Sequence, residues 1–276
     1  MRRRAERWLG LVRSLIIYWR PGRQRGLREL YRPFVGAGDL VFDVGAHLGD
    51  RTAAFRKLGA RVVALEPHPA VRRWLELLVG RSQGVSVRAE AVGGAVGTAR
   101  LVLSHRTPSV SSLAEDWPST LPERNLGFRG VRWDDSVEVP VTTLDALIEH
   151  SGLPRFCKID VEGYEVEVLA GLSHRIPALS VEFVAGALDI AQACVRRLEV
   201  LGDYEFNAVR GEERSFISKR WLAADELVAW LEGGAGSVSS GDVYARLRVK
   251  ADTGGSDWDA EGDGESDRDA EGSNDG

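Results

Sequence analysis

Short apolar runs alternate with amphipathic stretches along most of the chain, which is the pattern of parallel strands joined by helices. Residues 40–44 are apolar except for one aspartate, and a glycine turn and an amphipathic stretch separate them from a second apolar run at 61–65. A helix is expected next at 69–79 and a strand at 85–89. Later elements repeat the order, with strands at 156–160 and 178–183 and helices at 164–170 and 187–201. Because continuous apolar strands are buried on both faces, the pattern predicts an α/β fold with a doubly wound, mostly parallel sheet.

The end of the chain departs from this alternation. Strands are expected at 204–209, 215–218 and 243–247, with a single helix at 223–231 before the last of them. Strands joined without regular crossover helices favour antiparallel pairing. We therefore expect an antiparallel closing edge on the sheet.

The alternation also fails between the third and fourth parallel strands. Residues 91–97 read as a glycine-rich turn, and residues 104–137 hold two tryptophans, three prolines and four arginines. Long loops of a doubly wound fold gather at the carboxyl ends of the strands, beside the ligand. Residues 104–137 are therefore predicted to be a lid-like insertion, whose arginines either contact substrate or form an ordinary solvated surface.

Charge divides the 276 residues into three parts. Residues 1–32 contain ten arginines and two glutamates, a net charge of +8, whereas residues 251–276 contain ten acids and one arginine, a net charge of −9. The total is −5, so the main domain expected at 33–250 is mildly acidic, which argues against a nucleic-acid partner. The C-terminal part consists mostly of Asp, Glu, Gly and Ser and is predicted to be a disordered acidic tail, acting as a solubiliser or as a tether.

The N-terminal part is predicted to be a basic amphipathic helical segment. Its large apolar residues fall on one helical stripe: Trp8, Leu11, Val12, Leu15, Ile16 and Trp19. Such a stripe either packs on its own domain or lies on an anionic membrane surface as a peripheral contact. No segment has the length of a membrane span, and Arg13 and Pro21 do not fit a signal peptide. We expect a cytoplasmic protein, with membrane association as the alternative.

Cysteine and histidine spacing predicts no metal centre. Cys157 lies in an apolar strand pattern and Cys194 in a helix pattern, with no CxxC near either residue. Both are expected to be buried thiols. The histidines are scattered without ligand spacing.

The turn after the first strand has the features of a nucleotide-type cofactor site. Gly45 and Gly49 allow the backbone to approach a ligand, and Glu66 ends the second strand, where a carboxylate can accept hydrogen bonds from two ribose hydroxyls. Asp43 lies at the strand end, where it would repel a pyrophosphate but favour the cationic sulfonium and ammonium groups of S-adenosylmethionine. These residues favour S-adenosylmethionine over a dinucleotide.

A second group of acids follows the fourth parallel strand. Asp160 ends that strand, Glu162 lies in the next turn, and Glu182 lies near the end of the following strand. Because the fourth strand adjoins the first in a doubly wound sheet, these carboxylates are expected to face the turn that contains Gly45. Structural roles are the alternative, with Glu162 as a helix-terminus acid and Glu182 as a salt-bridge partner.

Six segments in the same order resemble the FkbM family of S-adenosylmethionine-dependent methyltransferases. They are FDVGAHLG (42–49), EPHP (66–69), AEAVG (89–93), VPVTTLDALI (139–148), KIDVEGYEVEVLAGL (158–172) and LSVEF (179–183). The resemblance covers about residues 38–185 and implies a class I methyltransferase (Rossmann-like) fold. It departs from the family at His47, where asparagine is usual. It implies cofactor contacts from these segments: Asp43, Gly45, His47, Gly49, Glu66, Pro67, Glu90 and Ala91.

The resemblance further implies O-methylation of a hydroxyl group on a sugar, a glycan or another natural product. Methyl transfer to a hydroxyl benefits from a general base, and Asp160 is the first choice, with Glu162 as its orienting partner or as an alternative base. A divalent ion is not predicted, although Asp160 with Glu182 is the pair that would hold one. Two other functions stay open. An NAD-dependent oxidoreductase is favoured by the 21-residue spacing from Gly45 to Glu66, and a non-catalytic binding protein could use the same fold.

Overall fold

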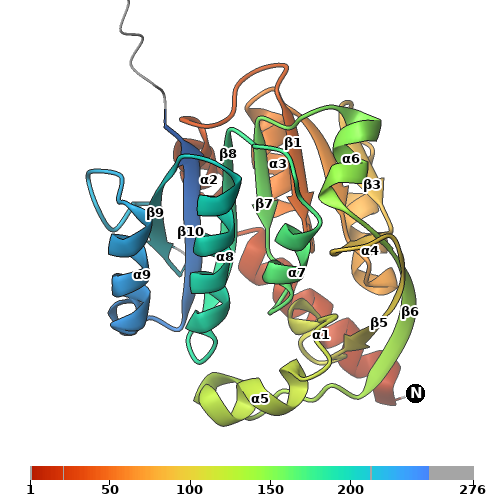
Figure 1. Ribbon diagram of the computed structural model, residues 1–276. Helices are drawn as coiled ribbons and strands as arrows, with labels where there is room; N and C mark the ends of the chain where they lie inside the picture. The colour runs from red at the N-terminus through yellow and green to blue at the C-terminus, as the bar shows by residue number, and fades with distance from the viewer. Residues whose placement is uncertain (1, 21, 212, 249–276) are drawn as a thin grey trace, which may run out of the picture.

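A seven-stranded sheet forms the centre of the protein (Figure 1), whose computed structural model describes residues 2–20, 22–211 and 213–248. The strand order is β3-β2-β1-β7-β8-β10-β9. Five neighbouring strands are parallel to one another: β3, β2, β1, β7 and β8. Strand β10 is antiparallel to both of its neighbours, β8 and β9. The expected fold class, with its antiparallel closing edge, is therefore confirmed. The strands are β1 (Leu40–Val44), β2 (Arg61–Leu65), β3 (Val85–Arg88), β7 (Phe156–Ile159), β8 (Ala178–Val184), β9 (Tyr204–Arg210) and β10 (Ser240–Leu247).

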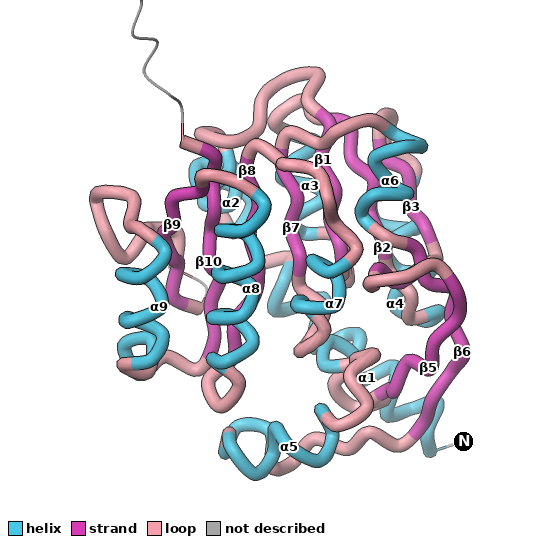
Figure 2. Tube along the Cα trace, in the orientation of Figure 1, coloured by secondary structure: helices cyan, strands magenta, loops and turns pink. Residues whose placement is uncertain are grey.

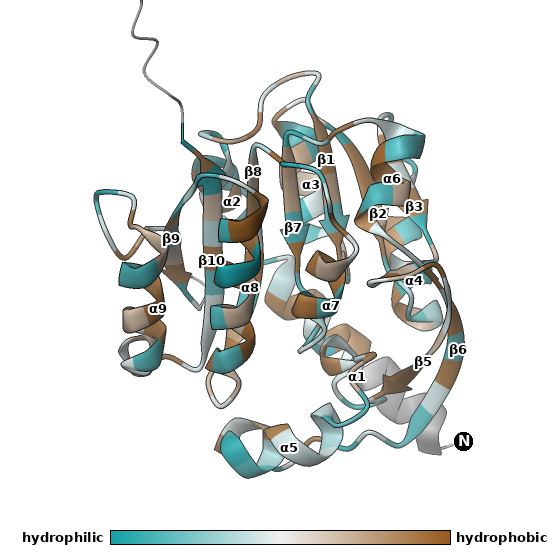
Figure 3. Ribbon diagram, in the orientation of Figure 1, coloured by the Kyte–Doolittle hydropathy of each residue, from teal (hydrophilic) through white to brown (hydrophobic). Residues whose placement is uncertain are grey.

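Helices cover both faces of this sheet, as the continuous apolar strands predict. One face packs against α6 (Leu144–Ser151), α7 (Glu165–Ala170), α8 (Leu188–Leu201) and α9 (Ala224–Glu232). The other packs against α2 (Arg23–Tyr31), α3 (Asp50–Lys57), α4 (Pro69–Leu75) and the π-helical turn η1 (Glu76–Gly80). Successive strand residues alternate between the two cores, since Val41 faces the second and Phe42 the first. Figure 3 shows the resulting apolar residues along the central strands.

A second sheet of three strands was not expected from the sequence. It has the order β4-β6-β5 and consists of β4 (Ala91–Val92), β5 (Gly97–Leu103) and β6 (Asp135–Thr142). The predicted turn at 91–97 therefore contains a two-residue strand and the start of another. The strand expected at 215–218 is also wrong, because Phe216 makes only an isolated bridge with Val209. This segment forms no ladder of strand hydrogen bonds with the other described residues. Phe216 instead packs against Tyr244, with ring centroids 5.2 Å apart.

The insertion at 104–137 lies at the carboxyl ends of β7 and β8 (Figure 2). It contains η2 (Pro108–Val110), α5 (Trp117–Arg124) and η3 (Leu126–Phe128) before it enters β6. The Oγ of Ser112 donates a hydrogen bond to the carbonyl of Glu162 at 2.7 Å, and the Nδ2 of Asn125 donates to the carbonyl of Ala185 at 2.8 Å. The segment is thus attached to the turns that follow both strands. Its function as a lid stays a prediction.

The N-terminal helix α1 (Arg2–Tyr18) packs on the main domain. This holds for the part of the helix whose side chains are described. Leu11 is buried against Leu48 and Val71, whereas Ile16, expected on the same stripe, is 63% exposed. This packing accounts for part of the expected apolar stripe. Peripheral membrane contact stays a prediction, and in the described part of the chain no helix combines the length and apolarity that a membrane crossing needs. The acidic tail expected at 251–276 lies outside the described residues.

Candidate active site

One cavity opens where the order of the central sheet reverses, between β1 and β7, which is the ligand position of doubly wound folds. Its empty volume is about 980 Å³ with the open solvent at its mouth included. Most of the residues expected at the site line it: Gly45, His47, Glu66, Pro67, Glu90, Ala91, Asp160 and Glu162. Glu182, Tyr18 and insertion residues Pro108 to Ser109, Ser111 and Leu113 also contribute to the wall.

The turn after β1 touches the end of β7 directly. Gly45 has a φ of +77°, and a Cβ at this position would lie 1.8 Å from the carbonyl oxygen of Asp160. Only glycine fits both the backbone conformation and the contact. The sequence predicts a glycine that leaves space for a ligand, and the structure shows that the neighbouring backbone takes this space.

Glu66 joins the ends of β1 and β2. Its Oε2 accepts a hydrogen bond from the backbone N–H of His47 at 2.9 Å, and its Oε1 accepts one from the N–H of His68 at 2.8 Å. Burial raises the pKa of Glu66 to about 7, and the two N–H donors oppose this shift only in part. Glu66 therefore holds the turn in shape while its carboxyl group borders the cavity.

His47 occupies a backbone conformation that few residues adopt. Its φ is +49°, in the left-handed region where asparagine and histidine are more frequent than most residues. The departure from the family's usual asparagine is therefore accommodated by the backbone. Burial lowers the pKa of the His47 imidazole to about 4, so the ring is neutral at physiological pH. Its Nε2 has no hydrogen-bond partner among the described residues and lies beside the cavity.

Two residues expected at the cofactor site do not line the cavity. Asp43 is 1% exposed and accepts a hydrogen bond from the Oγ1 of Thr52 at 2.5 Å. Burial raises the pKa of Asp43, although Lys158 and Thr52 oppose the shift. Gly49 lies at the start of α3, where an added Cβ would contact Leu75 at 2.6 Å. Both residues lie beneath the turn, on the side away from the cavity. Direct contact of either with a ligand therefore stays a prediction without geometric support.

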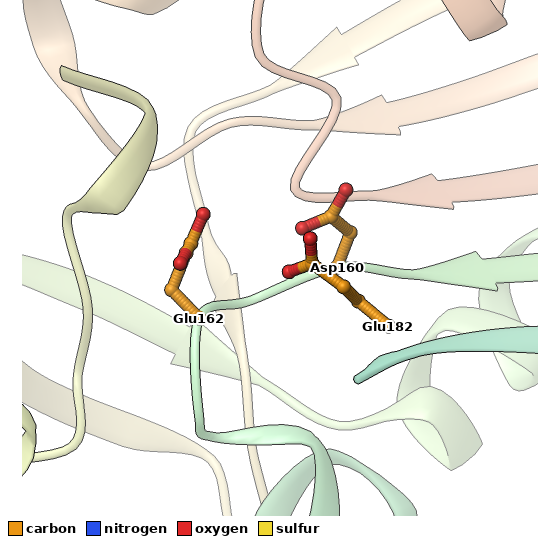
Figure 4. A group of neighbouring side chains, drawn as sticks. All are labelled: Asp160, Glu162 and Glu182. Atoms are coloured by element: carbon orange, nitrogen blue, oxygen red, sulfur yellow. The ribbon is translucent and has the colours of Figure 1, made fainter. Parts of the chain in front are cut away.

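Asp160, Glu162 and Glu182 form an acid cluster, with one carboxylate oxygen of each residue within 4.8 Å of the others. Figure 4 shows the carboxylates of Asp160 and Glu182 close together, with Glu162 reaching in from the turn after β7. Strand adjacency brings the cluster together, because Asp160 directly follows β7 and Glu182 lies near the end of the neighbouring parallel strand β8. The convergence expected from the sequence is therefore present in the structure.

Lys158 is the cation that faces this cluster. It is 1% exposed, and its Nζ lies 2.5 Å from the Oδ2 of Asp160. Burial is the largest influence on the pKa of Asp160 and raises it, but the charges of Lys158 and Arg51 and hydrogen bonds with Glu182 and Lys158 together hold that pKa well below its usual range. For Glu162 and Glu182, burial and the charge of Asp160 act together and raise the pKa values well above the ordinary range.

The charges of the cluster are thus not balanced by the lysine alone. One ammonium group faces three carboxyl groups, and the positive charge of Arg51 on the cavity wall is shared with Asp50, so the cluster favours bound protons or a further cation. A bound cationic ligand or a divalent ion would supply that charge, and carboxylate oxygens at this spacing are suitable ligands for Mg²⁺ or Ca²⁺.

Glu165 is a positioning residue that the sequence analysis missed. Its Oε1 accepts hydrogen bonds from the backbone N–H groups of Val161 at 3.1 Å and Gly163 at 3.2 Å. These bonds hold the turn that carries Glu162, whose own φ of +57° is strained. The signal was present in the sequence, since Glu165 lies at the start of α7, where acids commonly bond to free backbone N–H groups.

The remaining expected contacts differ in their surroundings. Glu90 lines the cavity and pairs with Arg88, whose hydrogen bond lowers the pKa of Glu90. Ala91 and Pro67 contribute apolar wall. The arginines of the insertion are all exposed, and none of them lines the cavity: Arg106, Arg124, Arg129 and Arg132.

A family model and a curated relative that match this chain are both described as methyltransferases. A family model described as "Methyltransferase FkbM domain" matches residues 43–232. The chain is 27% identical over 178 residues to the hexuronic acid methyltransferase AglP of Haloferax volcanii, and the match covers 63% of this chain and 66% of that protein. The chain thus spans just under two thirds of the relative's length.

Two solved structures are similar to this chain at low sequence identity and low TM-score. A TehB-like S-adenosylmethionine-dependent methyltransferase from Corynebacterium glutamicum has a TM-score of 0.45 at 12% identity, covering 88% of this chain and 96% of its own. Precorrin-6y C5,15-methyltransferase from Geobacter metallireducens has a TM-score of 0.42 at 12% identity, covering 82% and 87%.

Proposed function

We propose that this chain, which belongs to the FkbM methyltransferase family, transfers a methyl group from S-adenosylmethionine to a hydroxyl group of a sugar, a glycan or another natural product. The observation that carries the proposal is a single cavity with Glu66 on one side and the acid cluster on the other. The first is suited to a ribose diol and the second to a cationic group with a reacting hydroxyl beside it.

The residues present fit S-adenosylmethionine. Glu66 has carboxylate lone pairs left after its two backbone hydrogen bonds and can accept from ribose hydroxyls. The Nε2 of His47, unpartnered among the described residues, offers a further polar contact, and the excess of acids over Lys158 and Arg51 favours a ligand with positive charge. When bound, the cofactor supplies an electrophilic methyl group on a sulfonium.

The acid cluster provides the groups that would receive the acceptor's proton. Lys158 keeps Asp160 ionised at neutral pH, so Asp160 is the carboxylate ready to accept a hydrogen bond from the hydroxyl and orient it. Because its pKa is low, Asp160 is a weak base. We therefore expect it to take the proton of the acceptor hydroxyl only late in the methyl transfer. Glu162, with a raised pKa, is the stronger base once it is ionised.

Titration calorimetry tests the cofactor assignment. We expect binding of S-adenosylmethionine and of its demethylated product, and no binding of NAD. NAD binding without S-adenosylmethionine binding would instead support the oxidoreductase. Labelled S-adenosylmethionine should then be offered with uronic acids, neutral sugars and glycans, because the relative is a hexuronic acid methyltransferase. Cofactor binding without transfer to any acceptor would support a non-catalytic binding protein.

Cofactor affinity should fall in mildly acidic solution. Ribose hydroxyls bind better to an ionised Glu66, whose pKa is about 7 in the free protein, so binding strengthens as pH rises and levels off above that value. Below it, Kd should increase by up to about tenfold per pH unit. Calorimetry with the demethylated product between about pH 5.5 and 8.5 measures this dependence.

The matched variant is Glu66→Gln, which keeps the size of the side chain and removes its titration. We expect it to bind more weakly by about 1.5 to 3 kcal/mol at neutral pH. Its Kd should lose the pH dependence that Glu66 supplies. If the variant retains the dependence of the original protein, another group is responsible for it.

A further inference from the structure

The N-terminal segment contacts the turn that borders the cofactor cavity. The ring of Tyr18 meets the ring of His47 edge to face, with centroids 5.1 Å apart, and the Nε1 of Trp19 donates a hydrogen bond to the carbonyl of Leu48 at 3.2 Å. Both contacts reach residues between β1 and α3, the same turn that Glu66 holds from the other side. The contacts come from a helix end that lies 29 residues earlier in the chain.

Two further contacts follow at the start of α2. The Nε of Arg23 lies 2.9 Å from the Oδ2 of Asp50, and the two side chains are only 10% and 4% exposed. The Nε2 of Gln24 donates a hydrogen bond to the backbone carbonyl of Asp50 at 2.8 Å. An ion pair and a hydrogen bond that are partly shielded from solvent hold geometry more firmly than fully exposed ones do. The N-terminal segment thus contacts the turn at His47 and Leu48 and the first residue of α3, Asp50.

Tyr18 itself lines the cavity, together with Gly45 and Glu66. The family match begins at residue 43, so α1 lies outside it and supplies a wall that the matched region does not. In Figure 1, α1 (red) runs below the central sheet toward β5. Its Gly10 packs against the insertion, since an added Cβ would lie 2.8 Å from the carbonyl oxygen of Arg106.

We propose that α1 is part of the cofactor-binding site, with Tyr18 as a ligand-contacting residue, and that cofactor binding and docking of α1 stabilise each other. The inference rests on the proposed function, because the ligand is S-adenosylmethionine. A ligand that touches both Tyr18 and the cofactor turn adds contacts only in the docked state. Linkage then requires that the docked helix raises cofactor affinity by the same factor.

Calorimetry on the full chain tests the contact. Tyr18→Ala removes the ring from the cavity wall and should raise the Kd for S-adenosylmethionine about tenfold, the size of one aromatic contact. Tyr18→Leu keeps much of the apolar volume and should bind S-adenosylmethionine at least threefold more weakly than the original protein. This variant tests the contact if Tyr18→Ala does not fold. Ile16→Ala is the matched control on the same helix, 63% exposed, and should leave Kd unchanged.

Amide hydrogen exchange tests the coupling without any need for catalysis. Saturating S-adenosylmethionine should slow exchange of the amides at residues 10–19, whereas the surface helix α9 should be unaffected. The proposal is overturned if Tyr18 variants that fold bind as the original protein does, or if exchange in α1 does not respond to the cofactor. Failure of the original protein itself to bind S-adenosylmethionine would overturn the proposed function as well, so the two failures are distinguishable.

Discussion

Gly45→Ala is expected to abolish S-adenosylmethionine binding and to destabilise the fold by about 3 to 5 kcal/mol. The added Cβ would lie 1.8 Å from the carbonyl oxygen of Asp160, and backbone cannot rotate away as a flexible side chain can. The turn and the end of β7 must therefore separate. Because Glu66 and the acid cluster lie on either side of this contact, their separation disorders the whole site.

Gly38→Ala isolates the part of this effect that comes from backbone conformation. Gly38 has a φ of +83°, close to that of Gly45, but an added Cβ would meet nothing within 4 Å. The control should cost only about 1 to 2 kcal/mol and leave cofactor affinity unchanged. Denaturant unfolding and calorimetry measure the two quantities. Equal losses of stability in both variants would show that the contact with Asp160 has no effect.

Asp160→Asn should lower turnover by about 10² to 10⁴ while S-adenosylmethionine affinity changes only a few-fold. The amide keeps an oxygen that can accept from Lys158, but it neither carries the charge that orients the hydroxyl nor accepts its proton. Glu149→Gln, an exposed acid on α6, is the control for a general loss of negative charge. Single-turnover kinetics and calorimetry give the two measurements.

A chelator distinguishes the two roles that the acid cluster can have. If the original protein keeps its activity in a chelator, the cluster acts through proton transfer and orientation. If activity is lost and divalent ions restore it, Asp160, Glu162 and Glu182 hold a metal ion. Thermal unfolding must accompany both tests, because Lys158, at 1% exposure, would lose its oppositely charged partner and this loss would itself destabilise the protein. Near-normal turnover in a folded Asp160→Asn variant would contradict both roles.

Local pattern and strand adjacency were enough to predict most of the site. Gly45, Glu66 and Asp160 each lie at a strand end, and the parallel order of β2, β1 and β7 brings those ends together. The pairing of Lys158 with Asp160 was also visible in principle, since residues two apart in an extended segment share a face. The burial of Asp43 behind the turn was not, because it depends on how Thr52 of α3 packs.

Other features depend on contacts that no local pattern encodes. Strand β4 has only two residues, and the half-exposed β5 lacks a clear apolar alternation. Pairing with the distant β6 stabilises them both. The contact of Tyr18 with His47 is likewise set by how α1 packs as a whole. Propensity and periodicity report burial along one segment, and they do not report which distant segment supplies the partner.

The antiparallel position of β10 between β8 and β9 has a consequence for the order in which the chain can fold as it leaves the ribosome. Among the described strands, β9 pairs only with β10, and β8 has β10 as its second neighbour. Until residue 247 has emerged, β8 is an open apolar edge and β9 has no place in the sheet. The parallel half with Gly45, Glu66 and Asp160 can form earlier. A cofactor molecule present during synthesis would therefore encounter only the parallel half of the sheet. That half is open to aggregation and to chaperone binding until β10 inserts.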